Sequence, residues 1–308
     1  MNKFLVLIVV FFVSISCKKT EKGKANDIVK IEFQEVKKGD YELSKPTEKI
    51  KSVLVLFGGY PETPEDVKRE FKILDAAMKN GIAIVFMNYN QKLWINENEK
   101  QKLAAKLQSI LLENILPLEN IYFGGFSSGG NVALLIGDYL NENDQYQITP
   151  NGIFIVDSPI DLAALYFSSE KNIARNFSNV SVQESTWILE TLGKEFGNPH
   201  NDIFVYEKNA VFTSKTKNIN NIKNLKNTKI RLYTEPDTLW WKTNRMANYE
   251  QMNAYYIKML SEKLNDSKFE SVEYIATKNK GYRANGERHP HSWAIVAVDD
   301  LINWMLEQ

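Results

Sequence analysis

The chain has 308 residues, 44% of them hydrophobic, which is enough for one large domain or two small ones. Its 38 basic and 38 acidic residues cancel, so no broad basic surface is implied. We therefore expect no nucleic-acid partner.

The first 17 residues differ from the rest of the chain. One lysine precedes an unbroken apolar run from Phe4 to Val13, and small residues then lead to Cys17. The run is too short to span a bilayer comfortably and is typical of a secretory signal peptide. It resembles a bacterial lipobox, in which the cysteine is lipidated, although Ser-Ile-Ser stands in place of the usual Leu-Ala-Gly-like triplet. We expect a lipid anchor on Cys17 and a cell-envelope location; the alternatives are an ordinary signal peptide and an uncleaved anchor.

Residues 18–27 are polar and are expected to be a tether, followed by one domain over 28–308. Cys17 is the only cysteine, so this domain has no disulfide and no cysteine nucleophile. Two of the three histidines flank Pro290, a pattern that does not indicate a zinc site. We predict neither a metal nor a cofactor.

Short apolar runs alternate with amphipathic stretches along the domain. The runs typical of strands are 28–33, the region around Tyr41, 52–59, 82–90, 121–126, 152–159, 229–237 and 269–276. The expected helices are 64–79, 97–114, 128–140, 248–264 and one from about Trp293. The first two strands are predicted to form an antiparallel hairpin. The alternation that follows predicts an α/β protein whose mostly parallel central sheet has helices on both faces.

The alternation stops after Pro159 and resumes at Lys229. The intervening segment has helical stretches at 162–167 and 182–192 and an asparagine- and lysine-rich end. It predicts a helical insertion of about 160–227 that lies over the sheet.

The most informative motif is Gly125-Phe126-Ser127-Ser128-Gly129, which lies between a predicted strand and a predicted helix. It is not a phosphate loop of the Walker type, because Asn131 follows the last glycine where a lysine is needed. It matches the G-x-S-x-G pattern that exposes a nucleophilic serine on a tight strand-to-helix turn. We therefore expect Ser127 to be a nucleophile at the N-terminus of a helix, whose N–H groups favour nearby negative charge.

A serine nucleophile needs a histidine base and usually a carboxylate that orients it. His289 and His291 lie between the last strand and the last helix, and we favour His291 because it immediately precedes that helix. For the acid we favour Asp237, which follows the penultimate strand, with Glu235 and Asp157 as alternatives. The chain order is then serine, aspartate, histidine, which one hydrolase superfamily uses.

From about Ser52 onward, the chain resembles an α/β-hydrolase-fold protein. The resemblance implies that Ser127 is the nucleophile, Asp237 the acid and His291 the base, and that 160–227 is the cap. It also implies an oxyanion hole formed by backbone N–H groups. Ser128 supplies one donor, and the turn after the first central strand supplies another from Gly59 or, preferably, Tyr60.

Two further groups could contact a substrate. Trp240 and Trp241 follow the predicted acid and are candidates for a substrate pocket, or alternatively for core or cap packing. Arginines that could hold a charged substrate, or lie solvated at the surface, are Arg175, Arg245, Arg283 and Arg288.

The sequence thus predicts an envelope-anchored serine hydrolase. Its substrate is expected to be a small carboxylic ester, or alternatively an amide or peptide. The competing hypothesis is a non-catalytic binding lipoprotein on the same scaffold.

Overall fold

The computed structural model describes residues 32–89 and 92–307. The predicted signal peptide with Cys17, the predicted tether and most of the first predicted strand lie outside the described residues.

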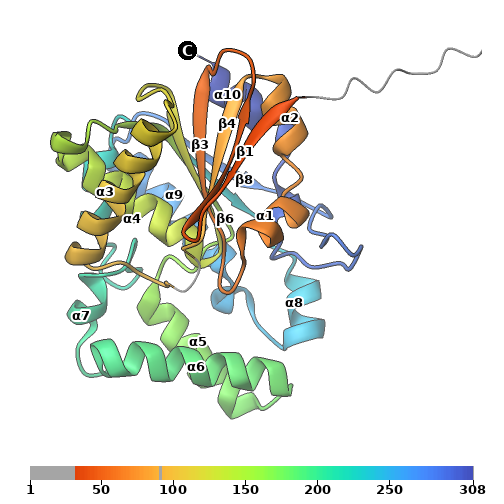
Figure 1. The fold of residues 1–308 in the computed structure, drawn as a ribbon. Coiled ribbons are helices and arrows are strands. Elements are labelled where there is room, and N and C mark those ends of the chain that lie inside the picture. The colour runs from red at the N-terminus through yellow and green to blue at the C-terminus, as the bar shows by residue number, and fades with distance from the viewer. Residues whose placement is uncertain (1–31, 90–91, 308) are drawn as a thin grey trace, which may run out of the picture. The chain divides into compact units, whose positions relative to one another are not determined.

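The described residues form an eight-stranded, mostly parallel sheet with the strand order β1-β2-β4-β3-β5-β6-β7-β8 (Figure 1). Strands β1 and β2 form an antiparallel hairpin, as predicted, and β2 also pairs antiparallel with β4. All other pairs are parallel. The strands are β1 (Phe33–Lys37), β2 (Tyr41–Pro46), β3 (Ser52–Phe57), β4 (Ile82–Met87), β5 (Ile121–Phe126), β6 (Pro150–Val156), β7 (Lys229–Thr234) and β8 (Val272–Ala276).

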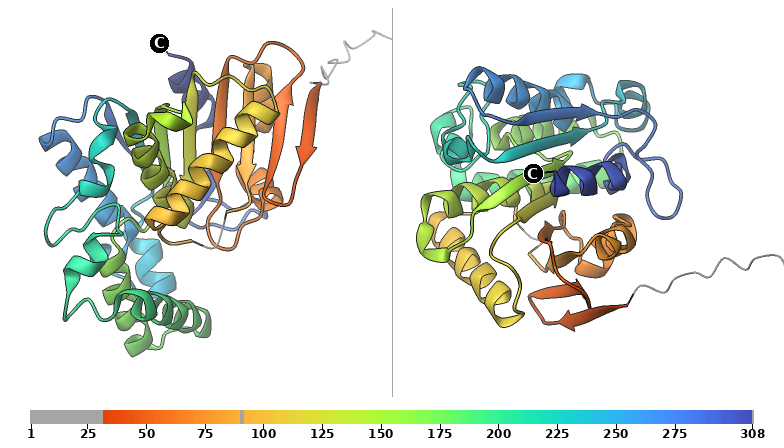
Figure 2. Two further views of the ribbon diagram at one scale, coloured as in Figure 1. Left: turned by 60° about the vertical axis from the view of Figure 1, so that its left-hand side comes forward. Right: turned by 90° about the horizontal axis from the view of Figure 1, so that it is seen from above.

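Helices cover both faces of this sheet, which explains why its central strands are continuously apolar. In β3, alternate residues face opposite layers: Val53 and Val55 belong to one hydrophobic cluster, Leu54 and Leu56 to the other. The first cluster includes residues of α3 (Glu97–Glu113), α4 (Ser128–Glu142) and α9 (Asn253–Asp266). The second includes residues of α1 (Pro64–Glu70), α2 (Leu74–Lys79) and α10 (Val298–Leu306) (Figure 2).

The segment between β6 and β7 forms a helical cap with its own small core. The cap contains α5 (Leu162–Arg175), α6 (Asn179–Phe196) and α7 (Ile203–Glu207). Its core residues include Leu162, Ile188, Leu192 and Tyr206, which are all buried. Figure 1 shows α5 and α6 beyond the edge of the sheet that carries the carboxyl ends of the parallel strands.

Several helices differ from the expectation, among them three close to the sheet. The predicted helix 64–79 is broken at Phe71, whose backbone (φ −102°, ψ 70°) ends α1 before α2 begins. Helix α8 (Thr238–Arg245) was not expected; Asp237 caps it by accepting a hydrogen bond from Trp240 N. The last helix starts at Val298, because residues 293–295 form a separate 3₁₀ turn.

Candidate active site

The predicted nucleophile elbow lies where β5 meets α4. Ser127 has φ 50° and ψ −126°, a combination that a non-glycine residue adopts only when its surroundings enforce it. Its N–H donates to Val156 O (2.9 Å), and its carbonyl accepts from Gly130 N (3.1 Å). A Cβ on Gly125 would lie 2.2 Å from the carbonyl oxygen of Gly129, so the turn is closed too tightly for a side chain there. Ser127 is half-buried, so it is not sealed in the interior.

The turn after β3 lies directly against this elbow. A Cβ on Gly59 would lie 2.9 Å from Ser127 Cβ and 3.0 Å from Phe126 Cδ1. Glycine is therefore required for this close approach. The predicted neighbourhood of the β3 turn and the serine is present in the structure.

His291 lies beside the elbow and is paired with a carboxylate. Its ring contacts Phe126, the residue before Ser127, with ring centroids 4.4 Å apart. Its Nδ1 lies 2.7 Å from Asp157 Oδ2. Nδ1 is thus engaged by the carboxylate, and Nε2 is the ring nitrogen left for proton transfer.

Asp157, the carboxylate paired with His291, is held by three further hydrogen bonds. It follows β6 and adopts φ 47°. Its other carboxylate oxygen, Oδ1, accepts from Thr234 Oγ1 (2.8 Å), its N–H donates to Tyr233 O (2.9 Å), and its carbonyl accepts from Asn253 Nδ2 (2.7 Å). Bonds from β7 and α9 therefore fix a carboxylate that is only 5% exposed.

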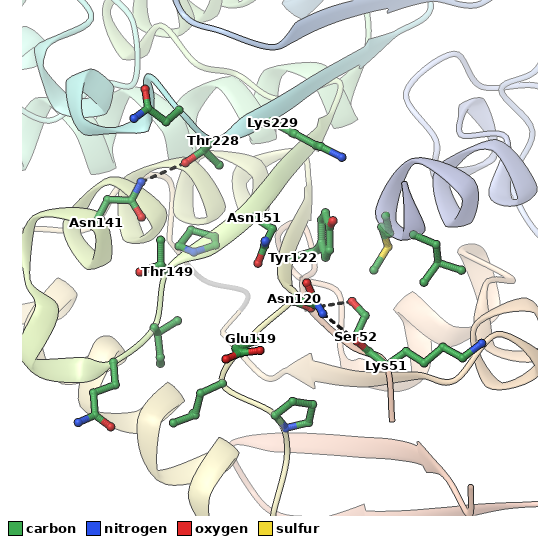
Figure 3. A pocket seen from close by; sticks show the side chains of 18 of the residues that line it. Lys51, Ser52, Glu119, Asn120, Tyr122, Asn141, Thr149, Asn151, Thr228 and Lys229 are labelled. Carbon is green, nitrogen blue, oxygen red and sulfur yellow. Dashed lines mark hydrogen bonds between the residues drawn. The ribbon is translucent and has the colours of Figure 1, made fainter. Parts of the chain in front are cut away.

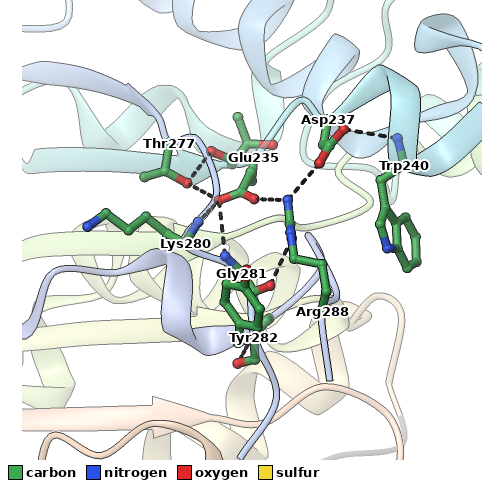
Figure 4. A network of polar contacts seen from close by, with 10 residues as sticks. Glu235, Asp237, Trp240, Thr277, Lys280, Gly281, Tyr282 and Arg288 are labelled. Carbon is green, nitrogen blue, oxygen red and sulfur yellow. Dashed lines mark hydrogen bonds and ion pairs between the residues drawn. The ribbon is translucent and has the colours of Figure 1, made fainter. Parts of the chain in front are cut away.

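The expectation that Asp237 would contact the histidine is not met. Asp237 accepts from Trp240 N at the start of α8 (2.9 Å) and from Arg288 Nη2 (2.7 Å) (Figure 4). The reason is local: Arg288, in the same loop as His291, lies between the carboxylates that follow β7. The structure brings Asp157, the alternative acid, to His291 instead.

Glu235, the other alternative acid, holds the loop that leads to His291. Its fully buried carboxylate accepts from Thr277 Oγ1 (2.9 Å), Lys280 N (2.8 Å) and Gly281 N (3.1 Å), and it pairs with Arg288 (Figure 4). All four donors belong to residues 277–288. This carboxylate therefore fixes the backbone that leads to His291 and does not contact the imidazole itself.

His289 is buried among aromatic rings, and no carboxylate of residues 32–89 and 92–307 is paired with it. Its ring lies 4.6 Å from that of Trp240 and 6.1 Å from that of Trp241. Burial, reinforced by the positive charges of nearby groups, lowers the pKa of His289 to about 3. The two tryptophans thus pack on the histidine that is not paired with an acid. His200 lies in the cap, where it pairs with Glu170 (2.9 Å).

The predicted oxyanion donors are partly engaged within the protein. Gly59 N–H donates to Glu62 Oε2 (2.8 Å), which removes it from the candidate donors. Tyr60 N–H donates to Ser128 Oγ (3.1 Å), so this preferred donor lies against the residue that follows the nucleophile. The N–H of Ser128 is in the first turn of α4, where helix geometry leaves it without an intrahelical acceptor.

Residues that the sequence reasoning missed also shape this site. Glu62 accepts from Trp293 Nε1 (3.2 Å) as well as from Gly59, and burial raises its pKa. Trp187 of the cap helix α6 stacks on Tyr60, with ring centroids 4.5 Å apart. The sequence offered one sign of this contact: Trp187 is a large aromatic residue within the predicted helical stretch 182–192 of the insertion. No signal was available for Glu62, whose role depends on the fold of the turn.

A large cavity lies at the opposite edge of the sheet. It has a volume of about 1510 Å³ and is lined by residues at the amino ends of the parallel strands, among them Ser52, Asn120, Asn151 and Lys229 (Figure 3). Ser127 and Asp157 follow the carboxyl ends of β5 and β6, so this cavity is not part of the elbow site.

Among residues 32–89 and 92–307, no cluster of three histidine, cysteine or acidic side chains could hold a metal ion. Within the same residues, no helix has both the length and the apolar character needed to cross a bilayer.

Comparisons with known proteins place this geometry in a fold. No protein-family model and no curated protein matches the chain. Esterase structures from Rhizomucor miehei align with a TM-score of 0.52 over 89% of this chain and 82% of that one, at 11% identity. Carboxyl esterase 2 from Tuber melanosporum aligns with a TM-score of 0.51 over 92% of this chain and 87% of its own, at 12% identity. MPT51 from Mycobacterium tuberculosis aligns with a TM-score of 0.53 over 89% of this chain and 98% of its own, at 10% identity. The chain has the α/β-hydrolase fold.

Proposed function

We propose that the protein is a serine hydrolase that cleaves a carboxylic ester through Ser127, His291 and Asp157. The observation that carries this proposal is the His291–Asp157 contact beside an elbow whose serine is held at positive φ. A buried carboxylate on Nδ1 fixes the imidazole tautomer in which Nε2 accepts a proton. The esterases among the similar structures support an ester as the substrate.

In the proposed reaction, His291 Nε2 removes the proton from Ser127 Oγ as this oxygen attacks the ester carbonyl. The imidazolium that forms is stabilised by Asp157 and then protonates the leaving alcohol. An acyl-enzyme remains, and water hydrolyses it. His291 again acts first as the base, now toward the water, and then as the acid, now toward Ser127 Oγ as this oxygen leaves.

The developing oxyanion would be stabilised by the N–H groups of Ser128 and Tyr60. Tyr60 N–H donates to Ser128 Oγ in the described state, so substrate oxygen competes with that hydroxyl for the donor. The stack between Tyr60 and Trp187 makes the cap part of the same wall of the site.

The decisive experiment is labelling of the purified domain with a fluorophosphonate, which reacts with activated serines. Wild type should be labelled, and Ser127→Ala should lose both labelling and at least about 10³-fold in ester turnover. Ser181→Ala, which removes a serine hydroxyl in the cap helix α6, is the control for labelling. A well-folded wild-type protein that takes no label would instead favour the non-catalytic binding lipoprotein.

We further propose that lipidation of Cys17 anchors this hydrolase in a bacterial cell envelope. The apolar run before this cysteine supports the proposal. Fractionation tests it: Cys17→Ser should move the protein out of the membrane fraction, and unchanged membrane association would argue for an uncleaved anchor.

A further inference from the structure

The six arginines of the chain fall into two groups. Three are each paired with two carboxylates: Arg69 with Asp66 and Glu70, Arg231 with Glu273 and Asp300, and Arg288 with Glu235 and Asp237. The other three, Arg175, Arg245 and Arg283, have no carboxylate partner among residues 32–89 and 92–307. All three are half-buried, so water solvates their charges only in part and no carboxylate compensates for the lost hydration.

The unpaired arginines gather around α8 and the histidine loop. Arg175, from the cap helix α5, donates to the carbonyl oxygen of Met246, the residue after Arg245. The guanidinium of Arg245 lies 5.6 Å from the centroid of the Trp240 ring, an arrangement that holds its position. Arg283 lies in the loop that leads to His291.

His289 connects these guanidinium groups with the reacting histidine. Its ring contacts Trp240 and lies 6.3 Å from the ring of His291. Arg283 lies in the turn that closes on His289, since the His289 N–H donates to Gly281 O (3.0 Å) and the Arg283 N–H to Glu287 O (2.8 Å). Burial, the charge of His291 and the charges of Arg283 and Arg245 lower the pKa of His289. His289 is 8% exposed, and its Nδ1 has no hydrogen-bond partner in the described part of the chain.

We propose that Arg245 and Arg283 bind a carboxylate on the substrate, so that the enzyme prefers esters carrying a free acid on their acyl or alcohol part. This inference rests on the proposed ester hydrolysis at Ser127. Half-buried guanidinium groups without counter-ions form an anion site, and guanidinium matches a carboxylate in geometry as well as charge. Arg175 adds positive charge, but all three of its guanidinium nitrogens already donate, to Met246, Lys171 and Asn172, whereas Arg245 makes one such bond, from Nη1 to Asn244 O (3.0 Å).

The test compares matched esters that differ in one acidic group. On the acyl side the pair is mono-p-nitrophenyl adipate and p-nitrophenyl hexanoate; on the alcohol side it is 4-acetoxybenzoate and its methyl ester. In at least one pair, wild type should favour the acid by about 10-fold or more in kcat/KM. Raising the salt concentration should reduce that ratio, since charge attraction across a partly exposed site is screened.

Variants assign the preference to the two arginines. Arg245→Gln and Arg283→Gln should each lower the acid-to-neutral ratio by about 10-fold, and Arg245→Glu should reverse it. Arg69→Gln, which removes an exposed arginine paired elsewhere, should leave the ratio unchanged.

Two results would overturn the inference: equal kcat/KM for acid and neutral esters in both pairs, or a ratio that the Arg245 and Arg283 variants do not change. If wild type hydrolyses none of the four esters and takes no fluorophosphonate label, the proposed function itself fails. The two failures are therefore distinguishable.

Discussion

Two neighbouring strand ends of the sheet carry acids, and the structure uses them differently. After β6, Asp157 pairs with the imidazole of His291 and with Thr234. After β7, Glu235 and Asp237 both pair with the guanidinium of Arg288. A single loop supplies both partners, Arg288 and His291, three residues apart. The β6 end is thus suited to proton transfer, because an imidazole ring nitrogen can accept and donate a proton, whereas the β7 end fixes the loop with a permanent charge.

This comparison separates a chemical role from a structural role in carboxylates that look alike in sequence. Each follows a buried parallel strand, and each lies near the histidine loop. They differ in the partner that the loop presents to them. The role of an acid after a strand can therefore be assigned only when the side chain that pairs with it is known.

The largest expected effect on kcat comes from removing the carboxylate charge after β6, and the same change after β7 is its control. Asp157→Asn should lower kcat for ester hydrolysis by about 10³- to 10⁴-fold, because the amide no longer stabilises the imidazolium or fixes its tautomer. Asp237→Asn, the same chemical change after β7, should lower kcat by less than about 10-fold. Steady-state kinetics on one p-nitrophenyl ester measure both. A larger loss for Asp237→Asn would reverse the assignment of the two strand ends.

One part of the site could be predicted from the sequence and another could not. The elbow at Ser127 could be predicted because its serine, its glycines and its flanking strand and helix are contiguous. The carboxylate that contacts His291 could not be predicted, because Asp157 and Asp237 both follow a predicted strand. Their partners depend on the path of residues 277–291, which Glu235 fixes by accepting from Lys280 N and Gly281 N.

The fold shows the same contrast between local and long-range information. Parallel strands, both helical layers and the cap were predicted, since their hydrophobic patterns are contiguous. Helix α8 was missed because its start depends on the capping role of Asp237, which had been interpreted as a catalytic acid. The break at Phe71 was missed because the hydrophobic spacing continues across it.

The second effect tests the structural role of the β7 end. Glu235→Gln should lower the free energy of unfolding by about 3 kcal/mol, because Arg288 loses half of its charge pairing and a buried carboxylate loses its bonds to backbone N–H groups. Chemical denaturation at neutral pH measures it. Glu273→Gln is the control: this carboxylate also pairs with an arginine but is 42% exposed, so its loss should stay below about 1 kcal/mol. Equal losses in the two variants would show that the Glu235 contacts are not structural.

The smallest expected effect separates the two histidines of the loop. The pKa of His289 is lowered from 6.5 to about 3, so below pH 6.5 the unfolded chain binds a proton that the folded chain does not. Stability is therefore lost as pH falls from about 6.5 toward 3. Phenylalanine keeps the contacts with Trp240 and Trp241 and removes the titration. Between pH 7.5 and pH 5, His289→Phe should thus lose about 1 to 2 kcal/mol less unfolding free energy than wild type. Parallel pH dependences would mean that His289 is protonated in the folded protein, and the packing described for it would be wrong.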